Sequence, residues 1–134
     1  GKSVSGKEYI FKWFNNVKVL DSLEFFDESK YQLTLAEGSW EDNEGNYGVL
    51  KCPGPIEINS EGKANLEVVC KGFDHLENKF SIILIRKSDY DVGIGEAIYT
   101  YGTGRYKSLV DMKCKYAIKY IKEVTKGFYR HICK

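Results

Sequence analysis

The chain has 134 residues, of which 43% are hydrophobic and 14% aromatic, and its 20 basic and 19 acidic side chains leave a net charge of +1. This length is typical of one domain, and the aromatic content excludes a disordered chain. The near-zero charge gives no long-range field for nucleic acid, and the longest apolar run, residues 82–85, is far too short for a membrane-spanning helix.

The N-terminal residues 1–6 (GKSVSG) have the composition of a linker. We expect them to form a flexible tail ahead of a single domain over residues 7–134. Because the chain begins with Gly1 rather than Met, we expect it to derive from a longer precursor from which an export signal could have been removed.

Beyond this tail, apolar and polar residues alternate with the period of a β-strand, and clusters of Gly, Asn and Asp interrupt the alternation. The predicted strands are Tyr9–Lys18, Tyr31–Glu37, Tyr47–Ile58, Ala64–Phe73, Lys79–Lys87, Val92–Tyr101, Met112–Ile121 and Gly127–Cys133. Predicted turns lie at residues 42–46, 59–62, 75–78 and 88–91. Residues 21–29 (DSLEFFDES) are expected to form a short helix, because Asp21 or Ser22 could cap it and Leu23 and Phe26 would share one face.

Strands spaced this closely leave no room for the crossover helices that parallel pairing requires, so the sheet is predicted to be antiparallel. Closure of about eight strands into a barrel removes exposed edges. The sequence therefore predicts an all-β fold, a small eight-stranded antiparallel β-barrel, with a β-sandwich as the alternative.

The cysteines give a further prediction. There are four of them, at Cys52, Cys70, Cys114 and Cys133, and three pairings are open to them. If residues 59–63 form a hairpin loop, Ile58 faces Ala64, and counting outward sets Cys52 opposite Cys70. If residues 122–125 close the last hairpin, Cys114 falls opposite Cys133. Directly opposed strand residues suit disulfide geometry, so these two bridges are predicted.

Pro53 and Pro55 weaken the first count, since proline removes ladder donors and favours a bulge that would shift the register by one. Free core thiols and a metal site are the alternatives, although the C-x-x-C and histidine spacings of zinc sites are missing. Two disulfides, each adding about 3 kcal/mol of stability, imply an oxidising compartment. The protein is therefore expected to be secreted or periplasmic.

The predicted strand 112–121 separates two kinds of side chain. One face carries Met112, Cys114, Tyr116, Ile118 and Tyr120, and the other carries Lys113, Lys115, Ala117 and Lys119. The first face is expected to be buried and the second solvated, with Arg130 joining the exposed lysines. A solvated barrel wall is the plain interpretation of this basic face, and contact with an anionic surface is the alternative.

The predicted strand 92–101 places Glu96 among apolar residues of one face, and Arg86 similarly follows apolar residues of the preceding strand. If both faces turn inward, burial would raise the pKa of Glu96 unless Arg86 compensates, and the pair would be a candidate binding or acid–base site. If they turn outward, both are ordinary surface charges. Tyr99 and Tyr101 share the opposite face of the strand and are candidate cavity residues.

Trp13 and Trp40 are further candidates for lining an apolar cavity, with core filling as the alternative. The two histidines, His75 and His131, have no recognisable nucleophile partner, so a hydrolase triad is not expected. No catalytic residue, metal ligand or cofactor is assigned.

Residues 102–111 (GTGRYKSLVD) resemble the G-[ST]-G-x-[FY]-x-x-A-x-G turn of the allene oxide cyclase and dirigent β-barrels. Gly102, Thr103, Gly104 and Tyr106 match this pattern, and Leu109 and Asp111 depart from it. The resemblance implies a barrel of that kind, or a calycin-like one, with an apolar cavity. Family members cyclise or couple small hydrophobic molecules, often as oligomers. In such a turn the two glycines would take positive φ, and Tyr106 would pack across the barrel end.

The leading functional hypothesis is therefore a non-enzymatic barrel that binds a small apolar ligand or a protein partner, and homo-oligomers are an additional expectation. The alternative is a cyclase- or isomerase-like enzyme that uses Glu96, Arg86 and Tyr99 or Tyr101 on a molecule in the cavity. A third hypothesis is a structural or inhibitory protein whose barrel is filled by side chains.

Overall fold

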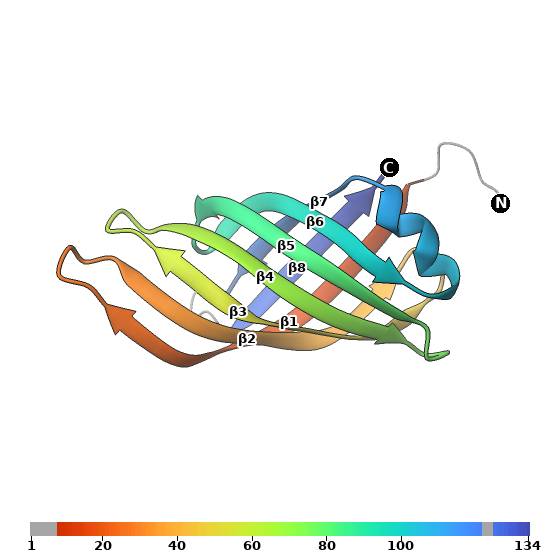
Figure 1. The fold of residues 1–134 in the computed structure, drawn as a ribbon, viewed down its shortest axis with the longest axis horizontal. Helices are drawn as coiled ribbons and strands as arrows, with labels where there is room; N and C mark the ends of the chain where they lie inside the picture. Colours follow the sequence, from red (N-terminus) through yellow and green to blue (C-terminus); the bar gives the residue numbers. More distant parts are fainter. Residues whose placement is uncertain (1–7, 122–124) are drawn as a thin grey trace.

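The computed structural model describes residues 8–121 and 125–134, whose strands form one closed antiparallel barrel (Figure 1). The elements are β1 (Tyr9–Glu24), β2 (Lys30–Asp42), β3 (Tyr47–Ile58), β4 (Lys63–Asp74), β5 (Lys79–Asp89), β6 (Val92–Gly102), a 3₁₀ helix η1 (Gly104–Asp111), β7 (Cys114–Tyr120) and β8 (Lys126–Cys133). Each strand pairs with its sequence neighbours, and β8 pairs with β1. The predicted eight-stranded barrel is confirmed, and the sandwich is excluded. The expected tail and residues 122–124 lie outside the described residues.

The short helix predicted at residues 21–29 does not form, and that prediction was wrong. β1 continues to Glu24, β2 begins at Lys30, and a turn joins them. Cross-strand pairing, as between Leu23 and Tyr31, satisfies the backbone here. A nine-residue helix would be marginal without a core to pack against. The capping pattern is therefore outweighed by the hydrogen bonds of the sheet.

Three hairpin turns are built in one way, at the predicted places. Each begins with a residue whose side-chain oxygen accepts hydrogen bonds from the backbone N–H groups two and four residues later. Asn59 Oδ1 accepts from the N–H groups of Glu61 and Lys63 at 3.0 and 2.9 Å. Asp42 and Asp74 do the same in the β2–β3 and β4–β5 turns. These turns fix the hairpin registers.

Both predicted disulfides are present, Cys52–Cys70 and Cys114–Cys133, and they leave no free cysteine in the described chain. Cys114 lies directly opposite Cys133. Between β3 and β4, Ile58 faces Ala64 as predicted, and the pairs on either side of the two prolines keep the same register. Pro53 and Pro55 therefore interrupt the hydrogen-bond ladder without introducing the bulge that would have moved Cys52 away from Cys70.

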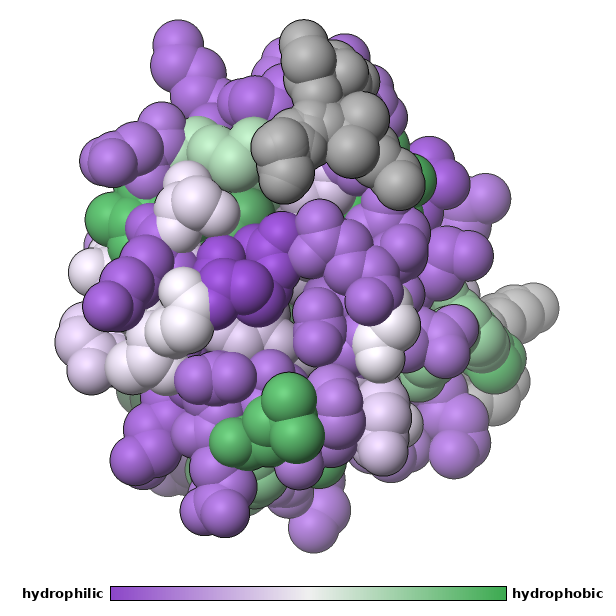
Figure 2. Space-filling view, turned by 90° about the vertical axis from the view of Figure 1, so that its right-hand side faces the viewer, coloured by the Kyte–Doolittle hydropathy of each residue, from purple (hydrophilic) through white to green (hydrophobic). Residues whose placement is uncertain are grey.

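Aromatic side chains fill the half of the barrel next to η1. Phe11 stacks on Trp40 with ring centroids 4.9 Å apart, and Phe80 meets Trp40 edge-on at 5.4 Å. The helix η1 closes this end with Tyr106 and Leu109, which are both buried. Viewed from outside, this end is mostly hydrophilic (Figure 2). Within the described residues, the single helix is neither long nor apolar enough to cross a bilayer.

The glycine turn before η1 agrees only in part with the expectation. Gly104 has a positive φ of 56°, and the Tyr106 ring packs at the barrel end as expected. Gly102, however, does not take positive φ. A Cβ on Gly102 would lie 2.5 Å from the carbonyl oxygen of Tyr106, so this glycine is needed for close approach. The 3₁₀ helix itself was not predicted.

Candidate functional site

The structure separates the six predicted binding residues. Trp13, Trp40, Arg86 and Tyr99 face the barrel interior and are almost fully buried. Glu96 and Tyr101 lie on the outer surface, where Tyr101 is 54% exposed. The predicted group therefore does not converge on one site.

The proposed pairing of Glu96 with Arg86 is corrected by the register of β5 and β6. Arg86 lies opposite Gly95 and points inward, whereas Glu96 lies opposite Ile85 and points outward. Directly opposed residues of an antiparallel pair project from the same face of the sheet, so Glu96 and Arg86 project from opposite faces. Glu96 is thus an ordinary surface charge.

A β-bulge explains why Tyr99 and Tyr101 diverge although they are two residues apart. Tyr101 pairs with Ser81 and Tyr99 with Ile82, so Thr100 is an extra residue in β6. The extra residue reverses the alternation beyond it. Tyr99 consequently enters the core, and Tyr101 faces outward.

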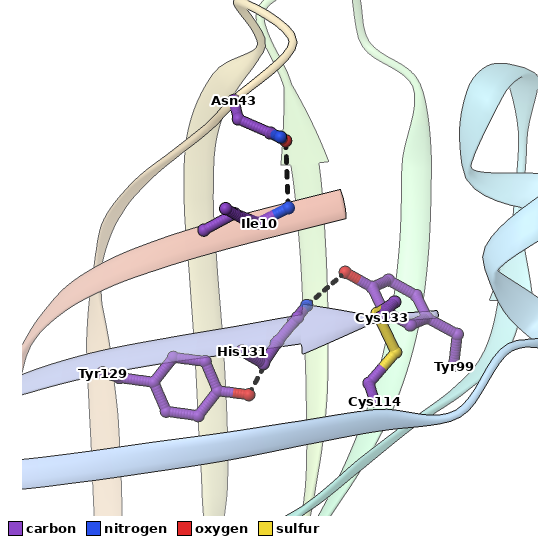
Figure 3. Close-up of a disulfide and its surroundings, with 7 residues drawn as sticks. All are labelled: Ile10, Asn43, Tyr99, Cys114, Tyr129, His131 and Cys133. Atoms are coloured by element: carbon purple, nitrogen blue, oxygen red, sulfur yellow. Dashed lines mark hydrogen bonds between the residues drawn. A yellow bond between two sulfur atoms is a disulfide. The ribbon is translucent and has the colours of Figure 1, made fainter. Parts of the chain in front are cut away.

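A buried polar group lies in the aromatic half. His131 faces Tyr116 across the last hairpin, as counting from the turn predicts, and has the hydrogen-bonded structural role expected for it, but its hydrogen-bond partners were not predicted. The His131 side chain is fully buried between two tyrosines, with Tyr99 Oη 2.9 Å from Nε2 and Tyr129 Oη 2.7 Å from Nδ1 (Figure 3). The imidazole also stacks on Phe11 at 4.4 Å. Burial lowers the pKa of His131 to about 3, so the ring is neutral and makes one bond as donor and one as acceptor. These two hydrogen bonds give the imidazole and both tyrosine hydroxyl groups a partner within the closed core.

The other half of the barrel retains a small cavity of about 40 Å³. Its walls are mostly apolar and include Trp13, Leu84, Ile118 and Tyr129, with Arg86 as the one charged residue among those that line it. About 10–15 Å³ suffices for one water molecule, whereas drug-sized ligands need roughly 300 Å³ or more. The cavity is thus suited to a guest of a few heavy atoms. The larger apolar container that the sequence suggested is occupied by side chains.

Arg86 is held at this cavity by the β5–β6 turn. Its Nη1 donates to Ser88 Oγ at 2.5 Å and to the carbonyl oxygen of Asp89 at 2.7 Å, and its Nη2 donates to the carbonyl oxygen of Tyr90 at 3.2 Å. The side chain is only 2% exposed. Its Nε–H is buried and makes no hydrogen bond to the described protein atoms. These bonds use three of the five N–H groups of the guanidinium, and Nε is its one nitrogen without a hydrogen bond to the described protein atoms.

Two glycines of β6 lie beside this arginine, and each leaves room for atoms that a Cβ would meet. A Cβ on Gly93 would lie 2.0 Å from Ser88 Oγ and 3.3 Å from Arg86 Nη1. A Cβ on Gly95, the residue opposite Arg86, would lie 2.6 Å from the ring of Tyr116. Alternate inward-facing glycines across from a large side chain are the sequence pattern that could have revealed this arrangement.

No carboxylate of residues 8–121 or 125–134 forms an ion pair with Arg86. The ion pairs in the described part of the chain are Lys30–Glu24, Lys63–Asp89, Arg105–Glu44 and Lys134–Glu8. Burial raises the pKa of the neighbouring Tyr120 to about 12 and raises that of Tyr116 as well, and the positive Arg86 opposes both shifts. Both phenols are therefore neutral at physiological pH, and among the described residues Arg86 is a cation without a counter-charge in a mostly apolar interior.

A wider groove of about 620 Å³ lies at the ends of β2–β5, beside Phe25, Tyr31 and Lys87. It is open to solvent and has both polar and apolar walls, so it would enclose a ligand less fully than the Arg86 cavity.

Together these features define a disulfide-linked, eight-stranded antiparallel barrel with one packed end and one buried cationic cavity. No family model, curated protein or solved structure matches the chain.

Proposed function

We propose that this protein binds a small carboxylate-bearing molecule, without chemical conversion, in the cavity beside Arg86. The carrying observation is the buried, unpartnered Nε–H of a guanidinium that lacks a counter-charge among the described residues. An isolated buried cation costs several kcal/mol, and a carboxylate that accepts from it would offset that cost. Apolar walls and a volume of about 40 Å³ favour a compact anion of the size of formate or acetate.

The disulfides support a place of action in an oxidising compartment, either secreted or periplasmic. A cyclase- or isomerase-like activity has less support, since only Arg86 of the four groups named for it lines the cavity. The resemblance of residues 102–111 to the allene oxide cyclase and dirigent turn supports a barrel of related architecture and carries no reaction to this chain.

The test compares acetate with acetamide, its neutral isostere, at constant ionic strength. We expect acetate to raise the melting temperature saturably, because binding to the folded state alone stabilises that state. Acetamide should have no such effect, since it cannot supply the counter-charge. Longer carboxylates such as hexanoate should bind more weakly than acetate because of the cavity volume.

Two variants localise the effect. R86Q should abolish the acetate response, and K87Q, which removes an exposed cation one residue further along β5, should retain it. The Arg86 Nε–H nuclear magnetic resonance signal of the unmodified protein should also shift with acetate, a readout that does not depend on R86Q folding. Equal responses to acetate and acetamide, or an acetate response that persists in R86Q, would contradict the proposal.

A further inference from the structure

Two exposed surfaces of opposite charge remain outside this proposal. The first, here called the acidic tip, is residues 21–28 at the end of the β1–β2 hairpin, which projects beyond the barrel (Figure 1). It carries the carboxylates of Asp21, Glu24, Asp27 and Glu28. Between them lie Leu23, Phe25 and Phe26, which are 59%, 49% and 110% exposed.

The tip is exposed because β1 is longer than the strand that closes the barrel onto it. The ladder between β1 and β8 ends at Asn16. Beyond Val17, whose N–H bonds to the carbonyl oxygen of Thr125, the described partner of β1 is β2 alone. An apolar stretch on such a projecting hairpin is the kind of surface that associates with another chain.

The second surface, here called the basic face, lies on the outer wall of β1, β7 and β8. Phe14 and Phe128 form its centre, with their rings edge-to-face at 6.0 Å and about half exposed. Five exposed cations surround these rings: Lys12, Lys115, Lys119, Lys126 and Arg130. None of the five forms an ion pair with the described residues. A shallow groove of about 420 Å³ runs between the rings and Lys12, Lys119 and Arg130.

We infer that the acidic tip of one molecule binds the basic face of a second copy of this chain. Each surface has exposed aromatic rings at its centre. Carboxylates predominate around the rings of the tip, where Glu24 also pairs with Lys30. Cations predominate around those of the face, although Glu41 lies opposite Lys12 and Glu96 opposite Lys115. An apolar centre with a complementary charged rim is the usual anatomy of a protein interface. One contact would thus cover both unpartnered apolar patches.

The contact cannot form within one molecule. Phe14 and Phe26 are separated by 12 residues along a single projecting hairpin strand, which is about 40 Å at roughly 3.3 Å per residue. The tip therefore points away from its own basic face and can reach only that of a neighbour. Since the two patches differ, the contact is head-to-tail and can be repeated from molecule to molecule.

Association should therefore depend on concentration and salt. In light scattering or sedimentation velocity at about 0.02 M NaCl, the mean mass should rise with protein concentration, and it should return to the monomer mass at about 0.5 M NaCl, where charges are screened. A monomer at every concentration in low salt would overturn the inference.

Charge-reversal pairs identify the two surfaces. E24K/E28K alters the tip and K119E/R130E alters the face, and each variant alone should associate at least tenfold more weakly. The control pairs E61K/E67K and K71E/K87E make the same charge changes at exposed positions elsewhere on the barrel and should associate like the unmodified protein. All the changes are at exposed residues, and circular dichroism verifies that each variant is folded.

Mixing the two charge-reversal variants is the decisive experiment. K119E/R130E keeps an intact tip and E24K/E28K keeps an intact face, so an equimolar mixture should form a one-to-one dimer that grows no further. This result would distinguish a head-to-tail contact from any symmetric dimer. A mixture that stays monomeric, or control pairs that weaken association equally, would overturn the inference. Neither result depends on the Arg86 cavity, whose acetate response is measured separately.

Discussion

The His131 network allows a quantitative test of what holds the packed half of the barrel together. The proposed change is His131→Phe. Phenylalanine preserves most of the ring volume and the stack on Phe11, whose planes are within 3° of parallel to the imidazole. It removes the partner of the Tyr99 and Tyr129 hydroxyl groups, both of which lie in the fully buried core.

The expected cost follows from those two hydroxyl groups. Each buried hydroxyl that loses its partner costs about 1–3 kcal/mol, so H131F should lower the free energy of unfolding by about 2–6 kcal/mol. Because ring volume is nearly conserved, overpacking or cavity effects should add less than about 1.5 kcal/mol. Equilibrium urea unfolding at pH 7.5, followed by tryptophan fluorescence, measures the difference.

The triple variant Y99F/H131F/Y129F is the matched control. It removes all three polar partners while keeping their shape, so it should be markedly more stable than H131F, since replacing a whole hydrogen-bonded set by apolar groups can be nearly neutral. Two results would contradict this explanation: H131F lowers the free energy of unfolding by less than about 1 kcal/mol, or the triple variant is less stable than H131F. Either result would mean that the hydrogen bonds of Tyr99 and Tyr129 do not explain why a histidine lies in the core.

Three other outcomes are expected. Burial lowers the pKa of His131 to about 3, so the unfolded chain binds more protons than the folded one below its ordinary pKa of about 6.5, and stability should fall as pH drops from 6.5 towards 3. Urea unfolding across that range measures this slope, which should flatten in the triple variant. Removing either disulfide, by C52A/C70A or C114A/C133A, should cost about 3 kcal/mol in chemical unfolding, because the bridges span similar separations of 18 and 19 residues. Gly38→Ala should lower the melting temperature more than Gly45→Ala, since its Cβ would lie 1.8 Å from the carbonyl oxygen of Phe14, whereas at Gly45 the alanine has open space and is strained only by the positive φ of 86°.

The disulfide pairing was predictable because a hairpin fixes its register at a local turn. Asn59 and Gly62 mark one such turn, and counting outward from it places Cys52 opposite Cys70 without knowledge of the rest of the fold. The same holds for Cys114 and Cys133. Counting outward from a turn gives the wrong partner only where a β-bulge adds an extra residue to one strand.

The bulge at Thr100 shows why the candidate site was harder to predict. Alternation alone assigns Tyr99 and Tyr101 to one face, and nothing in the residue types marks the extra residue between them. Whether Arg86 faces inward also depends on long-range strand pairing. The alternation of residues along one strand shows which side chains share a face, but not which of the two faces is buried. Tyr129 is two residues from His131 on β8, but Tyr99 comes from β6, so their meeting depends on packing between residues far apart in the chain.

Stability alone does not explain an arginine inside the barrel. Three N–H groups of Arg86 bond to the β5–β6 turn, but the acceptors there supply no counter-charge, and replacing a buried charge by an apolar residue of similar size is often neutral or stabilising. Gly93 leaves room for Ser88 and Arg86, and Gly95 for the carbonyl oxygen of Ile85 and the ring of Tyr116, although glycine within a strand is itself unfavourable. A buried charge at Arg86 and a glycine at Gly93 thus surround a donor, the Arg86 Nε–H, that has no acceptor among the described residues. The proposed anion at this donor would account for both.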